Sequence, residues 1–184
     1  MKNLNVDPRI KEVLITEDEI DQRAFDAAQW INQNYVGETP ILVGILKGCI
    51  PFLGKLLPNI TVDITLDFMA ISSFKGGIKA QTEPEIVTDL KSDVKDQDVI
   101  LVEDIVDTGN TISLVIDLLH NRGARTVKLI TLLDKKEGRK TNLVADFVCF
   151  DIPNVFIVGF GLDYQEIMRN FPYIGVLKEE VYKK

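Results

Sequence analysis

Three carboxylates within five residues are the strongest chemical signal in this sequence. An apolar run over 99–102 leads directly into Glu103 and Asp104, and Asp107 follows after two apolar residues. An unbroken apolar run is typical of a buried parallel strand, and open α/β sheets bind ligands at the carboxyl ends of such strands. Adjacent carboxylates repel one another and contribute nothing to packing, so their presence there indicates a binding site.

A turn of Thr108, Gly109, Asn110 and Thr111 comes next and opens a predicted helix. Backbone N–H groups, hydroxyls and a helix N-terminus at such a turn can bind phosphate, although the same residue types also form ordinary caps that bind nothing. Carboxylates beside a phosphate would repel it unless they hold sugar hydroxyls or a metal ion that accompanies the phosphate. The two features together predict a site for a phosphorylated sugar with a divalent cation.

Composition narrows the class of protein. The 184 residues are 46% hydrophobic and 27% charged, which predicts one globular domain with a sizeable core. A net charge of −7 argues against a general nucleic-acid or membrane binder. The sequence has no signal-peptide region and no apolar run long enough to span a membrane, and Cys49 and Cys149 are far apart. We therefore expect a cytoplasmic protein with reduced thiols.

Strand-like and helix-like segments alternate along the chain, which predicts an α/β fold with a mostly parallel sheet and helices on both faces. Strands are expected at 41–46, 62–72, 99–102, 127–133, 147–150 and 155–158. Helices are expected from a capping box at Thr16 to about Asn34, in a short segment beginning at Pro51, and after the turn as far as Gly123. Residues 73–84 have no periodicity, and a loop of this length is typical of a lid over a site.

Other ligand-binding signatures are incomplete. Residues 159–161 begin like a dinucleotide-binding motif, but its third glycine is missing, and residues 48–56 have the wrong spacing for a P-loop. The only histidine, His120, lies near the end of a predicted helix, where a structural role is expected, so no Ser-His or Cys-His pair is available. Cys49 lies close to Lys47, which could lower the pKa of the thiol, but inert packing is the better interpretation.

With these motifs identified, the chain resembles the hypoxanthine-guanine phosphoribosyltransferase family in its short bacterial form. Residues 102–111 are similar to the motif that binds phosphoribosyl pyrophosphate, which alone indicates only the wider phosphoribosyltransferase superfamily. Three further segments narrow the resemblance: the pyrophosphate loop at 46–48, the segment at 132–136 whose lysine reads the purine, and residues 156–178, which are similar to the 6-oxopurine family. The resemblance extends from about residue 10 to the end.

The resemblance implies a type I phosphoribosyltransferase-like fold in a single domain over 1–184. Its core would span about 16–150, and a small hood would be built from about 1–15 and 151–184. The implied reaction moves the 5-phosphoribosyl group from phosphoribosyl pyrophosphate to hypoxanthine or guanine, with Mg²⁺ as cofactor, and gives IMP or GMP and pyrophosphate. The family context is purine salvage, and a homodimer or homotetramer is the implied assembly.

The resemblance also assigns roles to individual residues. Pyrophosphate binding falls to Lys47, Gly48 and Arg169, with a strained peptide between the first two. Ribose and 5′-phosphate binding falls to Glu103, Asp104, Asp107, Thr108, Gly109, Asn110 and Thr111. Asp107 is in addition the general base. Purine binding falls to Lys135, Phe156, Ile157 and Asp163, and metal binding to Glu103, Asp104 and Asp163.

Without the resemblance, several of these residues have simpler interpretations. Lys135 could be a solvated turn residue, Phe156 could belong to the core, and Arg169 could be solvated surface. The chain also departs from the family in the lid, where Ser73 is followed by Phe74 and the family usually carries Ser-Tyr. A phenyl ring can still cover the site, but the hydrogen bond of a phenol is lost.

Two alternatives stay open at this point. One is a phosphoribosyltransferase that prefers xanthine, because the candidate bases differ at position 2, which main-chain groups read. The other is a phosphoribosyl-binding regulator of transcription or RNA. A regulator would be expected to have a basic face or an added DNA-binding segment, and the net charge of −7 argues against it.

Overall fold

The computed structural model describes residues 6–72 and 85–183, and it confirms the α/β class expected from the sequence. The main sheet has the strand order β4-β3-β2-β5-β6-β7 and is parallel except for the β3–β4 pair. Its strands are β2 (Ile41–Leu46), β3 (Thr65–Ser72), β4 (Glu85–Thr88), β5 (Asp98–Val106), β6 (Thr126–Asp134) and β7 (Phe147–Asp151). Short 3₁₀ turns occupy Leu57–Asn59 (η1) and Lys136–Gly138 (η2).

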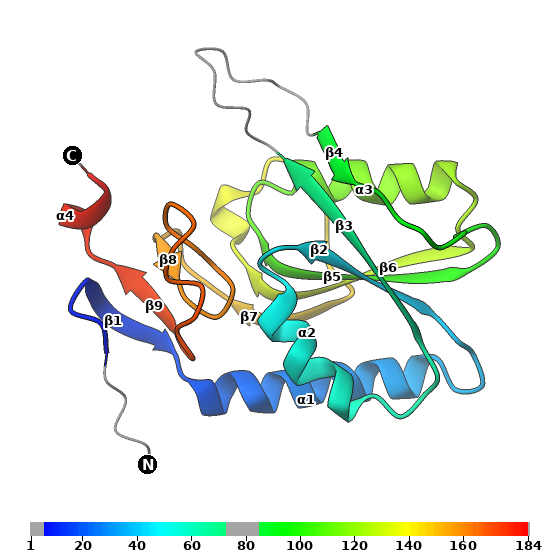
Figure 1. The fold of residues 1–184 in the computed structure, drawn as a ribbon, viewed down its shortest axis with the longest axis horizontal. Helices are drawn as coiled ribbons and strands as arrows, with labels where there is room; N and C mark the ends of the chain where they lie inside the picture. The colour runs from blue at the N-terminus through cyan, green and yellow to red at the C-terminus, as the bar shows by residue number, and fades with distance from the viewer. Residues whose placement is uncertain (1–5, 73–84, 184) are drawn as a thin grey trace.

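Helices cover both faces of this sheet (Figure 1). Helices α1 (Glu17–Asn34) and α2 (Ile50–Leu56) lie on one face, and α3 (Asn110–Asn121) lies on the other. Successive side chains of β5 alternate between the two layers, as they must in a strand. Ile100 and Val102 pack in the cluster that contains α1 and α2, whereas Val99 and Leu101 pack in the cluster that contains α3. Both faces of the strand are therefore buried, which accounts for its unbroken apolar run.

The ends of the helices follow local signals. Thr16 accepts a hydrogen bond from the Glu19 N–H, and the Glu19 carboxylate accepts one from the Thr16 N–H, so the expected capping box begins α1. Pro51 stands in the first turn of α2. Gly123 has φ of +86° just beyond the end of α3, where its N–H donates to the His120 carbonyl.

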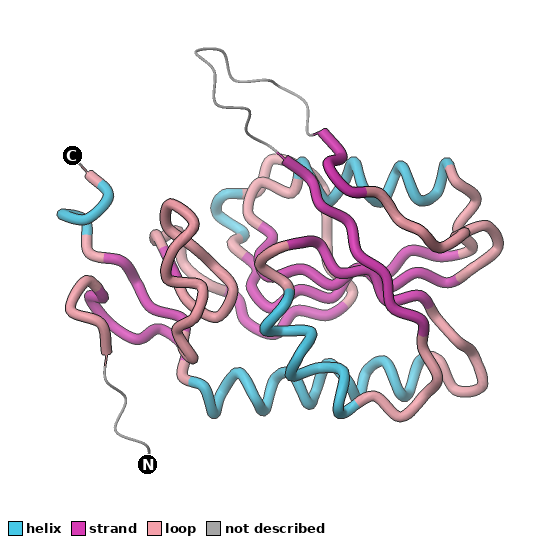
Figure 2. The backbone as a smooth tube through the Cα atoms, viewed as in Figure 1, coloured by secondary structure: helices cyan, strands magenta, loops and turns pink. Residues whose placement is uncertain are grey.

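A second sheet joins segments from the two ends of the described chain (Figure 1, Figure 2). It is antiparallel in the order β1-β9-β8, and its strands are β1 (Ile10–Ile15), β8 (Ile157–Val158) and β9 (Ile174–Leu177). The short helix α4 (Glu179–Tyr182) follows β9. The turns between β8 and β9 carry residues 159–173 toward the main sheet. The division into core and hood near residues 15 and 151 stays a prediction.

Several sequence-based boundaries were wrong. β5 does not end at residue 102 but continues to Val106, because its backbone pairs with β6 as far as the Val106–Asp134 partners. β3 begins at Thr65 rather than 62, and the strand expected at 155–158 shrinks to Ile157–Val158. Strands β1, β4 and β9 were not predicted. The lid residues Ser73 and Phe74 lie outside the described residues, and no helix of the described part is long and apolar enough to cross a membrane.

Candidate active site

The candidate site lies where the connections of the main sheet change direction. From β2 the chain passes through α2 to β3 on one side, and from β5 it passes through α3 to β6 on the other. Such a switch point leaves a crevice at the carboxyl ends of the two strands, where open α/β sheets bind ligands. A cavity of about 720 Å³ opens there. The predicted site residues that line it are Lys47, Gly48, Glu103, Asp104, Asp107, Thr108, Gly109, Thr111, Asp163 and Arg169.

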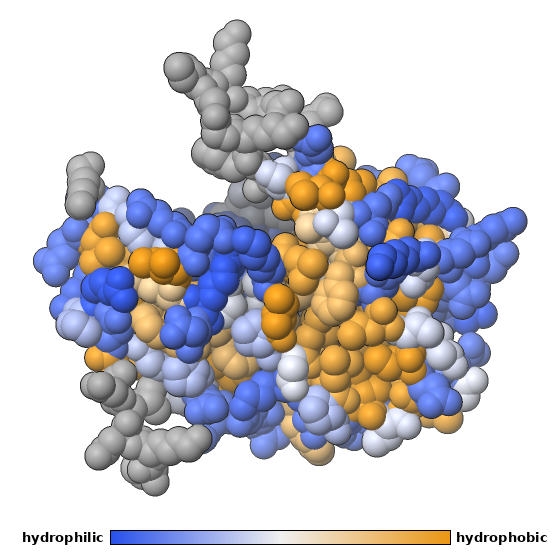
Figure 3. Space-filling view, viewed as in Figure 1, coloured by the Kyte–Doolittle hydropathy of each residue, from blue (hydrophilic) through white to orange (hydrophobic). Residues whose placement is uncertain are grey.

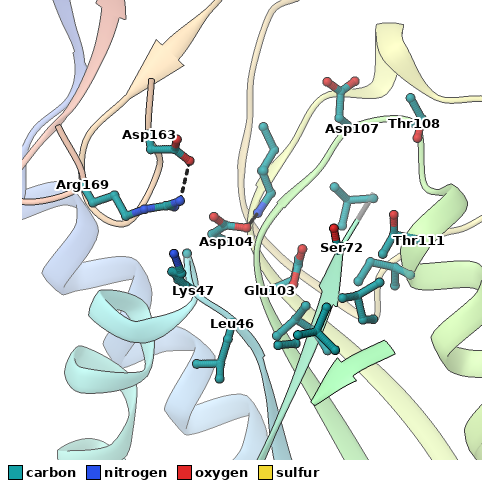
Figure 4. Close-up of a pocket in the computed structure, with 18 of the residues that line it drawn as sticks. Leu46, Lys47, Ser72, Glu103, Asp104, Asp107, Thr108, Thr111, Asp163 and Arg169 are labelled. Carbon is teal, nitrogen blue, oxygen red and sulfur yellow. Dashed lines mark hydrogen bonds and ion pairs between the residues drawn. The ribbon is translucent and has the colours of Figure 1, made fainter. Parts of the chain in front are cut away.

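Figure 4 shows three groups of side chains around this cavity. Lys47 and Arg169 lie on one side, and Thr108 and Thr111 lie on the opposite side. The acidic pair of β5, Glu103 and Asp104, lies between them. The arrangement therefore offers cations at one end, a hydroxyl-rich turn at the other, and carboxylates in the middle.

The acidic pair is held in a poorly solvated place. Burial, and secondarily the charge of Asp104, raises the pKa of Glu103 well above its usual range. Burial also raises the pKa of Asp104 from 3.8 to about 6, although the Ile105 N–H donates to its Oδ1 at 2.8 Å. Among the described residues, Glu103 Oε2 is buried and has no hydrogen-bond partner. Buried acceptors of this kind fit a hydroxyl donor or a cation.

These carboxylates also fit the role of magnesium ligands. Mg²⁺ is usually held by one or two carboxylates together with water and substrate phosphates. In residues 6–72 and 85–183, no group of three or more His, Cys, Asp or Glu side chains is placed to hold a metal ion. Glu103 Oε2 remains the buried oxygen that lacks a partner in this part of the chain.

The turn at 108–111, here called the phosphate loop, begins α3. Gly109 precedes the helix with φ of +82°, and its carbonyl accepts from the Ser113 N–H at 2.9 Å. A Cβ at Gly109 would overlap Thr141 Oγ1 and come 2.9 Å from Arg139 Cδ, so the loop needs glycine for both its conformation and its packing. The first N–H groups of a helix lack intrahelical partners and bind anions.

On the opposite side, the two cations already contact carboxylates. Lys47 Nζ lies 2.7 Å from Glu166 Oε2, and Arg169 Nη2 lies 3.1 Å from Glu166 Oε1 and 2.7 Å from Asp163 Oδ1. The hydrogen bond from Lys47 lowers the pKa of Glu166. Arg169 also donates from Nη1 to the carbonyl of Gly161 at 2.8 Å. Glu166 thus stands between the two side chains predicted to bind pyrophosphate.

Two glycines, Gly48 and Gly161, allow close packing around the pyrophosphate loop. A Cβ at Gly48 would overlap the Asp104 carboxylate, and one at Gly161 would overlap the Gly48 carbonyl oxygen and come 3.2 Å from Pro51 Cδ. The cis peptide joins Leu46 to Lys47. It therefore precedes Lys47, one bond before the strained peptide that the resemblance implied.

Within the described part of the chain, the remaining predicted residues do not line the cavity. Lys135 is close to it: its side chain is 11% exposed and its Nζ donates to Asp107 Oδ2 at 3.3 Å, so it is not a solvated turn residue. Phe156 is not a core residue either, since it is 38% exposed and stacks on Tyr182 with ring centroids 4.8 Å apart. Ile157 is buried on β8, and Asn110 is an exposed first residue of α3.

Two residues that the sequence gives no chemical role do not line the cavity. Cys49 is fully buried, and burial raises the pKa of its thiol to about 12, which is opposite to activation and confirms inert packing. His120 is exposed in the last turn of α3.

Glu166 and Arg139 were not predicted from the sequence. Glu166 adopts φ of +66° in a turn, and Arg139 lies in an irregular segment after β6. Neither segment has a periodic pattern, so only the folded contacts reveal that Glu166 lines the cavity and that Arg139 packs against the turn at 108–111.

Comparisons with known proteins identify the class of this fold and site. The family model described as "Phosphoribosyl transferase domain" matches residues 14–165. A crystal structure of a hypoxanthine phosphoribosyltransferase from Staphylococcus aureus superposes with a TM-score of 0.90 at 40% identity, covering 96% of each chain.

Curated relatives make the assignment narrower. A protein of Streptococcus agalactiae is 47% identical over 175 residues, which cover 95% of this chain and 97% of the relative. A protein of Streptococcus pneumoniae is 50% identical over 173 residues, which cover 94% of this chain and 96% of that relative. Both are named hypoxanthine-guanine phosphoribosyltransferase. The chain belongs to the hypoxanthine-guanine phosphoribosyltransferase family.

Proposed function

We propose that this protein transfers the 5-phosphoribosyl group from phosphoribosyl pyrophosphate to hypoxanthine or guanine, giving IMP or GMP and pyrophosphate in purine salvage. The observation that supports this most directly is the order of groups across the cavity. A sugar that carries a phosphate at one end and a pyrophosphate at the other matches the phosphate loop, the acidic pair and the two cations in turn. Membership of the family supports the same reaction.

Charge development in the reaction matches the proposed placement. Displacement of pyrophosphate from C1 of the ribose leaves negative charge on the departing group and builds positive charge on the sugar ring. Lys47 and Arg169 would stabilise the departing pyrophosphate once Glu166 releases them, and Glu103 and Asp104 would hold the ribose hydroxyls beside the developing cation. Mg²⁺, which we propose as the cofactor, would neutralise further charge on the pyrophosphate.

The purine is proposed to bind between Asp107 and Phe156. Asp107 has a half-exposed carboxylate, and it would remove a proton from the base as the new bond forms. Lys135, whose Nζ lies 3.3 Å from Asp107 Oδ2, would donate to the 6-oxo group. An ammonium donates but cannot accept, so this contact would disfavour the 6-amino group of adenine. Phe156 would stack on the purine, the Ile157 backbone would read position 2, and Asp163 would help to hold a metal-bound water.

Incubation with hypoxanthine, Mg²⁺ and phosphoribosyl pyrophosphate tests the proposed function, with release of IMP and pyrophosphate as the expected result. Asp107→Asn should lower kcat about a hundredfold to ten-thousandfold because it removes the general base, while binding of phosphoribosyl pyrophosphate is retained. Asp117→Asn, on the exposed side of α3, is the matched control. Equal losses in kcat and in substrate binding would contradict the assignment of the base.

The alternatives give different results in the same assay. A regulator would bind the nucleotide without turnover, and an enzyme that prefers xanthine would use that base with the highest kcat/KM. Lys135→Ala should reduce discrimination against adenine, since the 6-oxo contact disappears. Unchanged selectivity would remove Lys135 from the purine pocket.

The assembly and location are proposals as well. Figure 3 shows apolar side chains gathered over α2 and β3, where Ile50 is 54% exposed and Leu66 is 41% exposed. An apolar surface of this kind supports a homodimer or homotetramer, which sedimentation would distinguish from a monomer. The two reduced cysteines support a cytoplasmic location.

A further inference from the structure

We propose that Arg139 is a positioning residue that fixes the phosphate loop and the backbone of Asp107. It does not line the cavity, yet its side chain lies directly behind the turn that is proposed to bind the 5′-phosphate. The inference rests on the proposed function, because it assigns Arg139 a task in the same site.

The guanidinium of Arg139 gathers acceptors from three segments. Nε donates to the Asp107 carbonyl at 3.0 Å, and Nη2 donates to the Val106 carbonyl at 3.3 Å. Nη1 donates to the Leu143 carbonyl at 2.5 Å, and Nη2 also contacts the Asp134 carboxylate. Four of the five N–H groups of the side chain are therefore used, and two of them hold consecutive carbonyls where β5 passes into the phosphate loop.

The surrounding contacts make this side chain a rigid support. The Arg139 side chain is 12% exposed and that of Asp134 is 5% exposed, so the ion pair between them is shielded from water.

Main-chain hydrogen bonds also join the segment after β6 to the loop. The Lys140 N–H donates to the Thr108 carbonyl at 2.9 Å, and the Lys135 N–H donates to the Val106 carbonyl at 2.9 Å. Gly109 packs directly on the Arg139 stem. The segment after β6 thus forms the floor beneath the phosphate loop.

No other side chain can make the same set of contacts. Lysine keeps the positive charge beside Asp134, but a single ammonium cannot reach two consecutive carbonyls and the Leu143 carbonyl with fixed planar geometry. Loss of the guanidinium would remove its donors from the Asp107 and Leu143 carbonyls, would leave the Val106 carbonyl only the Lys135 N–H, and would free the turn to shift. A displacement of about 1 Å in a group that positions substrate can reduce activity about a hundredfold.

The proposal predicts selective damage to one end of the site. The phosphate loop and Asp107 depend on Arg139, whereas Lys47 and Arg169 lie across the cavity and have no contact with it. A variant of Arg139 should therefore bind a nucleoside 5′-monophosphate poorly and bind pyrophosphate normally. A residue that only supported the overall fold would weaken both ligands together.

The test compares IMP and pyrophosphate binding by calorimetry, both with Mg²⁺, in Arg139→Met and Arg139→Lys. The Lys variant keeps a cation beside Asp134 and so remains informative if the Met variant does not fold. Arg122→Lys is the matched control, because Arg122 forms a guanidinium pair with Asp89, at 2.7 and 2.6 Å, that touches no part of the loop. Thermal unfolding of each variant is measured in parallel.

In Arg139→Lys we expect the Kd for IMP to rise about tenfold to a hundredfold, with the Kd for pyrophosphate within about twofold of wild type. We also expect the KM for phosphoribosyl pyrophosphate to rise, because the phosphate loop shifts. We expect kcat to fall as well, because Asp107 moves with the loop. Equal losses for IMP and pyrophosphate, or an unchanged Kd for IMP, would overturn the proposal. Turnover of the wild-type protein tests the proposed function separately, so the two can fail independently.

Discussion

Replacing Asp104 by asparagine should make the free protein more stable at neutral pH while it removes activity. The Asp104 carboxyl has its pKa raised from 3.8 to about 6, chiefly by burial, so the ionised form is destabilising in the folded state. Because the folded protein binds this proton more tightly than the unfolded chain does, the free energy of unfolding falls as the pH rises through the window between these values. The asparagine side chain has no charge to bury and avoids that loss.

The size of the effect follows from the shift. A change from 3.8 to about 6 corresponds to about 3 kcal/mol at pH values above the window. Residual solvent in the cavity and the burial cost of an amide reduce the net gain to about 1–2 kcal/mol. In a domain of this size, each kcal/mol moves Tm by about 2–4 °C, so Asp104→Asn should raise Tm by about 2–8 °C at pH 7.5.

Thermal unfolding followed by circular dichroism, at pH 4.5 and pH 7.5, measures this difference. The gain should shrink to less than half at pH 4.5, where the wild-type carboxyl is protonated in the folded state, and IMP formation should be lost at both pH values. Asp117→Asn, an exposed carboxylate of α3, controls for a general change in charge. Identical Tm values for Asp104→Asn and wild type at pH 7.5, or a gain that is the same at both pH values, would refute the reasoning.

Three further substitutions address other contacts of the site. Gly48→Ala should lower kcat/KM at least about tenfold, because its Cβ would overlap the Asp104 carboxylate. Gly54→Ala is the control: it has open space around it, so it should retain activity and add about 0.5–1 kcal/mol to the free energy of unfolding. Similar kinetics in the two variants would contradict the steric argument. Glu166→Gln should lower the Kd for pyrophosphate by about two- to fivefold in titration calorimetry, since an internal competitor for two cations is removed, and a higher Kd would argue against that competition. Tyr182→Leu should raise the KM for hypoxanthine about two- to tenfold because Phe156 loses its stacking partner, and an unchanged KM would separate the two rings functionally.

The parts of the fold predicted correctly are those specified by local signals. The capping box at Thr16 fixed the start of α1, and the apolar run at 41–46 matches β2 residue for residue. The predicted end of β5 was wrong because polar side chains can mark a binding site without ending the backbone pairing of a strand, and this pairing continues to Val106. The short strands β1 and β9 depend on each other, with Ile10 opposite Leu177, so neither has a pattern that could be read alone.

The residues of the candidate site also differ in whether local sequence signals could predict them. Glu103, Asp104 and the phosphate loop are contiguous in the chain, and their residue types alone indicated a sugar phosphate. Lys135 and Arg169 required the family resemblance, since single cations in irregular segments have no distinguishing pattern. The support from Arg139 could not be predicted, because it consists of hydrogen bonds to carbonyls of a different strand.

The contact between Gly48 and Gly161 restricts how this protein can vary. Two segments far apart in the sequence meet there with main chain against main chain, so an added methyl group at 161 would collide with a peptide carbonyl. Trimming a neighbouring side chain creates no space for it, because the obstacle is part of the polypeptide itself. We therefore expect a suppressor screen that starts from Gly161→Ala to recover reversions to glycine and no compensating mutation at a second position.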